Sequence, residues 1–174
     1  MKKLYKKYQH YTLPICLIFI LSFSRIIPHP SNFTPILAVG IFSGFYFKNF
    51  IKSFFIVLLA MFIGDLYLGF HNTMFFTYTS LALAVLIGIF IKQFKFNEIL
   101  VSGFASSIMF FVITNFGVWA LSGMYVKTFS GLLQSYIMAI PFFHNTLIST
   151  LVYLAIFKLL FEISIRRKLI KNFI

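Results

Sequence analysis

The sequence predicts an all-α fold, a polytopic membrane bundle of six transmembrane helices. Three observations predict this fold class. The 174 residues are 60% hydrophobic, 21% aromatic and only 10% charged, and a soluble domain of this size does not bury so much apolar surface. The apolar residues form six runs, and the basic residues cluster between these runs in an alternating pattern. We therefore expect the lipid bilayer to cover much of the surface.

The apolar runs place the six helices in one integral membrane domain over residues 1–174. We expect helices at about 11–27, 33–47, 51–69, 75–91, 99–121 and 142–161. A helix needs roughly 20 residues to cross the hydrocarbon core, and about 17 at the least. Four runs meet this length comfortably, whereas the second is short and the first contains Pro14 and continues into Arg25. The segment 122–141 is expected to form an external loop or a short interfacial helix.

The basic residues set the orientation. With a cytoplasmic N-terminus, thirteen of the fifteen fall in inside segments, and only Arg25 and Lys127 fall outside. Because cytoplasmic loops are rich in Lys and Arg, we predict both termini on the cytoplasmic side of a bacterial inner membrane. The start of the chain, with Ser22 and Ser24, also fits a cleavable signal peptide, which would leave five spans in the same orientation.

Composition and motifs exclude several classes of function. The net charge of +12 lies in short clusters that suit anionic lipid headgroups, so no nucleic-acid partner is expected. A single cysteine, Cys16, permits no internal disulfide or CxxC motif. His29, His71 and His144 lack metal-ligand spacing, so neither a metal nor another cofactor is expected. Because no HExxH or GxSG-type motif is present, we predict that the protein is not an enzyme.

The polar residues are distributed unevenly across the predicted membrane. Polar groups within a bilayer are costly and usually face the bundle interior or a water-filled cavity. Here they gather in the outer third and the external loops, and comprise Arg25, His29, Asn32, Asp65, His71, Asn72, Asn115, Trp119, Tyr125, Gln134, His144 and Asn145. A pore would need polar groups through its whole depth. The distribution therefore predicts a pocket that opens to the external side.

Two pairs within this set are the sharpest candidates. Arg25 and Asp65 are opposite charges at a similar depth, which fits either an ion pair between two helices or direct contact with a ligand. Asn115 and Trp119 are four residues apart and share a helix face. An amide beside an indole suits a planar organic ligand, and the alternative is an interfacial Trp anchor with Asn bonded to a neighbouring helix.

Pro141 is expected to open the sixth helix, because the first turn of a helix tolerates proline. His144 and Asn145 would then lie at a helix N-terminus, where an anionic or carbonyl group is favoured. On the second helix Gly40 and Gly44 form a GxxxG pair, which predicts close helix packing within the bundle.

Four segments carry a resemblance to a known family. These are Arg25 to Pro35 (RIIPHPSNFTP), Gly64 to Gly69 (GDLYLG), Ser106 to Trp119 and Pro141 to Thr146 (PFFHNT). Together they resemble a family of uncharacterised bacterial six-helix membrane proteins, itself similar to the substrate-binding S components of energy-coupling factor (ECF) vitamin transporters. The resemblance covers about residues 20 to 162.

This resemblance implies a small protein with both ends cytoplasmic and a vitamin-like ligand near the external surface, under loop lids. It also implies that the motif residues line or brace the pocket, namely Arg25, Asn32, Asp65, Asn115, Trp119 and Asn145. A coupling transmembrane subunit with ATPases is the implied partner. Many S components dock through an AxxxA-like pair on the first helix, whereas Leu13 to Ile20 reads LPICLIFI, which argues against that docking mode.

We therefore expect a membrane-embedded binding or uptake protein for a small organic micronutrient, with a pocket built from the six motif residues and His144. Two alternatives stay open at this point. One is a structural or accessory membrane subunit without its own ligand. The other is an intramembrane enzyme on a lipid-linked substrate that depends on His144 or Asp65.

Overall fold

The computed structural model describes residues 2–166, with side chains described from 12 to 164. This range forms six helices, which confirms the predicted all-α fold. They are α1 (Lys2–Ile26), α2 (Ile36–Phe47), α3 (Phe50–Leu68), α4 (Met74–Phe90), α5 (Phe96–Leu121) and α6 (Phe129–Arg166). The chain beyond 166, with the predicted inside charges Arg167, Lys168 and Lys171, lies outside the described residues.

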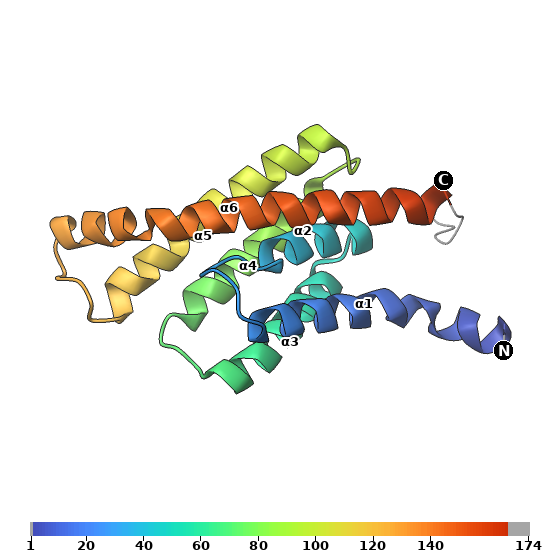
Figure 1. The fold of residues 1–174 in the computed structure, drawn as a ribbon, viewed down its shortest axis with the longest axis horizontal. Helices are drawn as coiled ribbons and strands as arrows, with labels where there is room; N and C mark the ends of the chain where they lie inside the picture. The colour runs from blue at the N-terminus through green and yellow to red at the C-terminus, as the bar shows by residue number, and fades with distance from the viewer. Residues whose placement is uncertain (1, 167–174) are drawn as a thin grey trace.

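The helices run back and forth between two ends of an elongated molecule (Figure 1). The start of α1 and the end of α6 lie together at one end with the connections 48–49 and 91–95, and we name this the terminal end. The connections 27–35, 69–73 and 122–128 lie towards the other end, which we name the loop end. This alternation is the path that the sequence predicted for six consecutive crossings.

The shortest helix, α2, is the centre of the fold. It packs against α3, α4, α5 and α6, and its residues from Ile36 to Phe45 are all buried. Glycine allows α2 and α4 to touch: a Cβ on Gly44 would lie 2.2 Å from the carbonyl oxygen of Val85, and one on Gly88 would lie 2.1 Å from that of Ile41. Because protein surrounds α2, its length does not have to match the thickness of the lipid.

The outer surface is that of a membrane protein. Three helices, α3, α5 and α6, are long and apolar enough to cross a membrane by length and composition, and three shorter helical segments are also apolar. Large side chains such as Phe19, Phe75 and Phe90 are 70–80% exposed. So many outward aromatic side chains are unusual on a surface that faces water and are ordinary on one that faces lipid.

Lysines bind the backbone at the terminal end. Lys48 Nζ donates to the carbonyl oxygens of Ile89, at 2.9 Å, and of Ile91. Lys158 Nζ donates to the carbonyl oxygen of Phe94 at 3.0 Å. Partial burial lowers the pKa of the Lys48 amine, and the nearby charge of Glu98 opposes this shift. Lys48 thus satisfies carbonyl groups that the end of α4 leaves free, and Lys158 holds the connection 91–95.

The start of α6 corrects the sequence prediction. The helix begins at Phe129 rather than at 142, and Pro141 lies inside it. Thr128 Oγ1 accepts a hydrogen bond from the Gly131 N–H at 3.3 Å, as an N-cap residue does. Proline persists inside membrane helices because neighbouring groups satisfy the carbonyl that it leaves unpaired. His144 and Asn145 therefore lie well within a 38-residue helix and not at a helix N-terminus.

The other boundaries differ less. The second helix begins at Ile36 rather than 33, the third and fourth each begin and end one residue earlier than predicted, and the fifth begins at Phe96 rather than 99. The first helix begins at Lys2 rather than 11 and runs through Pro14 to Ile26, and the sixth ends at Arg166 rather than 161. The polar connection ahead of α2 is thus longer than predicted, and this connection contributes to the candidate site.

Candidate functional site: a cavity at the loop end

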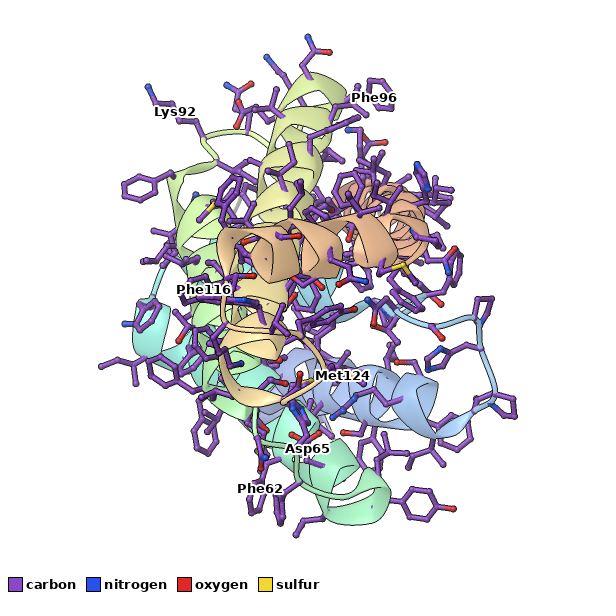
Figure 2. The ribbon with its side chains drawn as sticks, turned by 90° about the vertical axis from the view of Figure 1, so that its left-hand side faces the viewer. Phe62, Asp65, Lys92, Phe96, Phe116 and Met124 are labelled. Atoms are coloured by element: carbon purple, nitrogen blue, oxygen red, sulfur yellow. The ribbon has the colours of Figure 1, made fainter. Side chains whose placement is uncertain are left out.

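A cavity of about 810 Å³ opens at the loop end of the bundle. It is lined from α1, α3, α5 and α6, from the start of α4, and from the connections 27–35, 69–73 and 122–128, whereas α2 contributes Ile36. Met124 of the 122–128 connection is labelled in Figure 2, which views the molecule from this side. The volume lies in the range of small-molecule sites, roughly 300–1,000 Å³.

Arg25 reaches the cavity from the last turn of α1 and is held there by α3. Its Nη2 pairs with Oδ1 of Asp65 at 2.7 Å, and its Nη1 donates to the carbonyl oxygen of Met61 at 2.8 Å. Gly64 leaves room for the guanidinium, since a Cβ there would lie 2.5 Å from Nη1. Arg25 lines the cavity with a side chain that is 14% exposed. The ion pair between two helices, the first alternative for these residues, is therefore present.

Asp65 itself lies behind Arg25 and does not line the cavity. Figure 2 places it between α3 and α1, and it is 1% exposed. Its second oxygen, Oδ2, accepts a hydrogen bond from the Tyr78 hydroxyl at 2.6 Å. Asp65 thus orients Arg25 instead of meeting a solute. Tyr78 of α4 was missed by sequence reasoning, because one tyrosine among many aromatic residues carries no signal.

Asn115 lines the cavity, whereas Trp119 does not. Asn115 lines the cavity and donates from Nδ2 to the carbonyl oxygen of Phe111 at 2.8 Å, which leaves its Oδ1 without a donor among the described residues. Trp119 does not line the cavity; its indole N–H donates to the carbonyl oxygen of Val126 at 3.0 Å. The Lys127 amine lies 5.6 Å from the centre of the indole ring. Trp119 therefore anchors the 122–128 connection.

Of the three predicted residues Asn32, His144 and Asn145, Asn32 alone lines the cavity. Asn32 lines the cavity and has a positive φ of 63°, a conformation that asparagine adopts more readily than most residues. Asn145 of α6 does not line it and donates from Nδ2 to the carbonyl oxygen of Ser31 at 3.0 Å. Asn145 therefore holds the 27–35 connection on α6. His144 is exposed and lies away from the lining.

An aromatic wall forms one side of the cavity. Its central ring, Phe111 of α5, has its centroid 5.1 Å from that of Phe143 on α6, and both residues line the cavity. Tyr136 of α6, which does not line the cavity, supports Phe111 at a centroid distance of 5.5 Å. Phe110 and Phe142 also line the space. Sequence reasoning missed this wall because the chain contains 26 phenylalanines, and most of them serve packing or face lipid.

Two buried hydroxyl groups lie one turn deeper on α5. Ser106 and Ser107 are 2% and 0% exposed, and neither hydroxyl has a hydrogen-bond partner among the described residues. Buried polar groups are normally bonded. Other buried hydroxyls of the bundle, such as those of Ser102 and Thr150, donate to a carbonyl oxygen of their own helix.

Comparison with known protein families assigns the chain to one of them. The model of a family of unknown function, DUF6580, matches residues 6–171. The chain belongs to this family. The match spans all six helices, so the cavity lies wholly within the DUF6580 domain. Membership in a family without a known function was predicted and is confirmed, whereas the similarity to S components stays a prediction. Neither a curated protein nor a solved structure matches the chain.

The DUF6580 cavity brings together three of the predicted residues, Arg25, Asn32 and Asn115, with His29 and His71. The other four predicted residues support it from behind or lie outside it. Within the described part of the chain, no group of three His, Cys, Asp or Glu side chains is placed to hold a metal ion. The arrangement provides donors, an amide oxygen and an aromatic surface, which suits binding of an organic solute.

Proposed function

We propose that the protein is a multi-pass protein of the bacterial inner membrane that binds a small, vitamin-like organic solute from the external side and serves its uptake. The observation that carries this proposal is the cavity of about 810 Å³ at the loop end, whose lining combines a few polar groups with aromatic rings. Sites for small organic molecules have this composition.

The charge distribution supports the orientation in this proposal. Lys48, Lys92, Lys95 and Lys158 lie at or near the terminal end, whereas Arg25 and Lys127 belong to the loop end. Because lysine and arginine favour the cytoplasmic side, the terminal end faces the cytoplasm. The cavity then opens to the outside, where a scavenged nutrient arrives.

Native mass spectrometry of the detergent-purified full chain tests the binding proposal. We expect the intact chain to carry one small organic molecule. Asn115→Ala should lose that molecule, because Asn115 lines the cavity. The matched control is Asn97→Ala, the same change at an exposed position at the terminal end of α5, and it should retain the molecule.

An empty chain that carries a second protein instead would contradict the proposal and favour an accessory subunit. Uptake is tested separately, with the identified molecule supplied in radiolabelled form to cells that contain or lack the chain. A coupling subunit with ATPases, the partner that the resemblance implies, should copurify if uptake draws on ATP. Equal uptake by both cell types would restrict the function to binding.

A further inference from the structure

We infer that the ligand of this cavity is an anion, with a carboxylate or phosphate group joined to an aromatic or heteroaromatic body. This inference rests on the proposed function, because it names the ligand class of the same cavity. It follows from three features of the site: the charges that line the cavity, the contacts that hold Arg25, and the aromatic rings in the lining.

No carboxylate of the described residues lines the cavity. The chain has only three acidic residues, and both oxygens of Asp65 are engaged, by Arg25 and by Tyr78. Glu98 accepts the backbone N–H groups of Lys92 and Gln93 in the connection before α5. Glu162 pairs with Lys158 near the end of α6. A cationic ligand would therefore lose its hydration without gaining a counter-ion.

Arg25 offers donors in a fixed orientation. A guanidinium carries five N–H groups, and the contacts with Asp65 and Met61 use two of them. Asp65 and Met61 fix the orientation of the group, and Arg25 is a lining residue of the cavity whose remaining N–H groups have no partner among the described residues. A planar fork of donors matches a carboxylate or phosphate, and charge-assisted hydrogen bonds of this type are the stronger ones.

Two histidines line the same cavity, and each ring donates at both of its nitrogens only when the imidazole is protonated. Nδ1 of His29 contacts the carbonyl oxygen of Pro30 at 2.8 Å, and Nδ1 of His71 contacts Oγ1 of Thr73 at 2.9 Å. Neither Nε2 has a polar partner within the described range, and both side chains line the cavity. Among the lining residues, Arg25 is the one with a permanent charge, and that charge is positive.

The aromatic wall specifies the rest of the ligand. Phe111 of α5 and its neighbour Phe143 of α6 both line the cavity, while Arg25 enters from α1. Aromatic rings pack favourably on one another in offset or tilted arrangements. A ligand that satisfies both features has an acidic group for Arg25 and a flat ring for the wall.

Binding of four probes to the purified full chain, measured by isothermal titration calorimetry, tests this inference. Indole-3-acetate, indole-3-acetamide and tryptamine share one aromatic body and differ in charge, and octanoate is an acid without a ring. We expect indole-3-acetate to bind roughly tenfold more tightly than the amide, as a charge-assisted bond is worth more than a neutral one. Tryptamine should not bind measurably, and octanoate should bind more weakly than indole-3-acetate.

The variant Arg25→Gln/Asp65→Asn removes both charges together, so that no buried charge is left unpaired. It should bind the acetate and the amide equally. Lys127→Gln is the matched control, because Lys127 lies over Trp119 near the cavity without lining it, and it should keep the preference for the acetate. If the double variant still binds indole-3-acetate more tightly than indole-3-acetamide, Arg25 does not bind the acidic group.

The other outcomes separate this inference from the proposed function. Equal or tighter binding of the amine or the amide would overturn the anionic class, and equal binding of octanoate would overturn the aromatic body. If no probe binds while mass spectrometry finds a retained neutral or cationic molecule, the inference fails and the proposed function stands. If no probe binds and the chain is empty, both fail.

Discussion

At the scale of single residues, the interior of the bundle contains a complete set of partners for one buried charge. Asp65 is bonded by Arg25 and Tyr78, and Arg25 in turn bonds the carbonyl oxygen of Met61. Removing one member of a buried ion pair is costly because the other charge stays buried without compensation. The pair between Lys158 and Glu162 provides the natural comparison, because its side chains are 24% and 44% exposed and a pair that solvent reaches contributes little.

We expect Asp65→Asn to lower the free energy of unfolding by about 3–5 kcal/mol, the usual cost of breaking a buried pair. Glu162→Gln should lower it by less than about 1 kcal/mol. Unfolding in detergent by heat or guanidinium, followed by circular dichroism, measures both. Equal losses in the two variants would show that the Asp65 pair is not buried in the protein as it exists in a membrane mimetic.

The two unpaired serines lead to a prediction of opposite sign. Ser107→Ala removes a buried hydroxyl that has no partner among the described residues, so we expect unfolding free energy to stay the same or rise by about 1 kcal/mol. Ser53→Ala is the control, because the Ser53 hydroxyl donates from α3 to the carbonyl oxygen of Ser43 in α2 at 2.9 Å. That variant should lose about 1 kcal/mol. A larger loss in Ser107→Ala would reveal a bonded water at this hydroxyl.

The sequence predicted the role of a residue only where a charged residue stands within an apolar run, which is unusual. Arg25 and Asp65 are opposite charges within apolar runs, so their pairing was among the alternatives. The role of Trp119 was left open, because both a ligand contact and a loop anchor place an indole near the membrane surface. The bonds that Asn145 and Trp119 make to the connections 27–35 and 122–128 depend on tertiary contacts that no local pattern records.

At the scale of helices, α2 and α4 pack together through the GxxxG pair of α2. The two glycines of this pair differ in how much space a side chain would have. A Cβ on Gly44 would collide with the backbone of Val85, whereas a Cβ on Gly40, one turn earlier, would lie 3.5 Å from the Ala84 side chain, an ordinary contact. The predicted GxxxG packing is therefore confirmed at Gly44, and Gly40 faces the same helix with room to spare.

Gly44→Ala should force α2 away from α4 and lower the free energy of unfolding by about 1–3 kcal/mol or more, the usual cost of overpacking. Gly40→Ala should be neutral or slightly stabilising, since alanine favours a helix by about 1 kcal/mol over glycine. Thermal unfolding of the two variants side by side decides this. Equal stability of both would mean that α2 and α4 separate more easily than their backbone contact indicates.

The existence of the six helices was predictable, and the start of the last was not. Long apolar runs identify membrane helices reliably because the bilayer demands a minimum length. For α6 the proline at 141 indicated a boundary, yet the helix begins thirteen residues before 142, at Phe129. Thr128 followed by Gly131 was the available signal, a cap that accepts from the third residue of the helix.

At the scale of the whole molecule, the alternating path of the chain and the positions of the lysines define two chemically different ends. The terminal end presents lysines and the carboxylates Glu98 and Glu162, and the loop end presents the cavity. This asymmetry was predictable from the sequence, since charged and polar residues are segregated along the chain. The shape of the cavity was not predictable, because it depends on how the helices diverge.

Cysteine labelling in intact cells tests the proposed orientation. In a Cys16→Ala background, Ser122→Cys at the loop end should react with a membrane-impermeant maleimide. Gln93→Cys, in the connection between α4 and α5, should react only after lysis. Both positions are exposed, so the difference reports the side of the membrane. The reverse pattern would place the cavity on the cytoplasmic side and exclude capture of an external solute.

The shortness of α2 sets the distance between the cavity and the opposite end of the molecule. Ile36, its first residue, lines the cavity, and Phe47, its last, lies next to the connection at the terminal end. Twelve residues of helix rise about 18 Å, which is well below the thickness of the hydrocarbon core, about 30 Å. One short helix, packed against the other helices of the bundle, therefore spans the distance from the cavity to the terminal end.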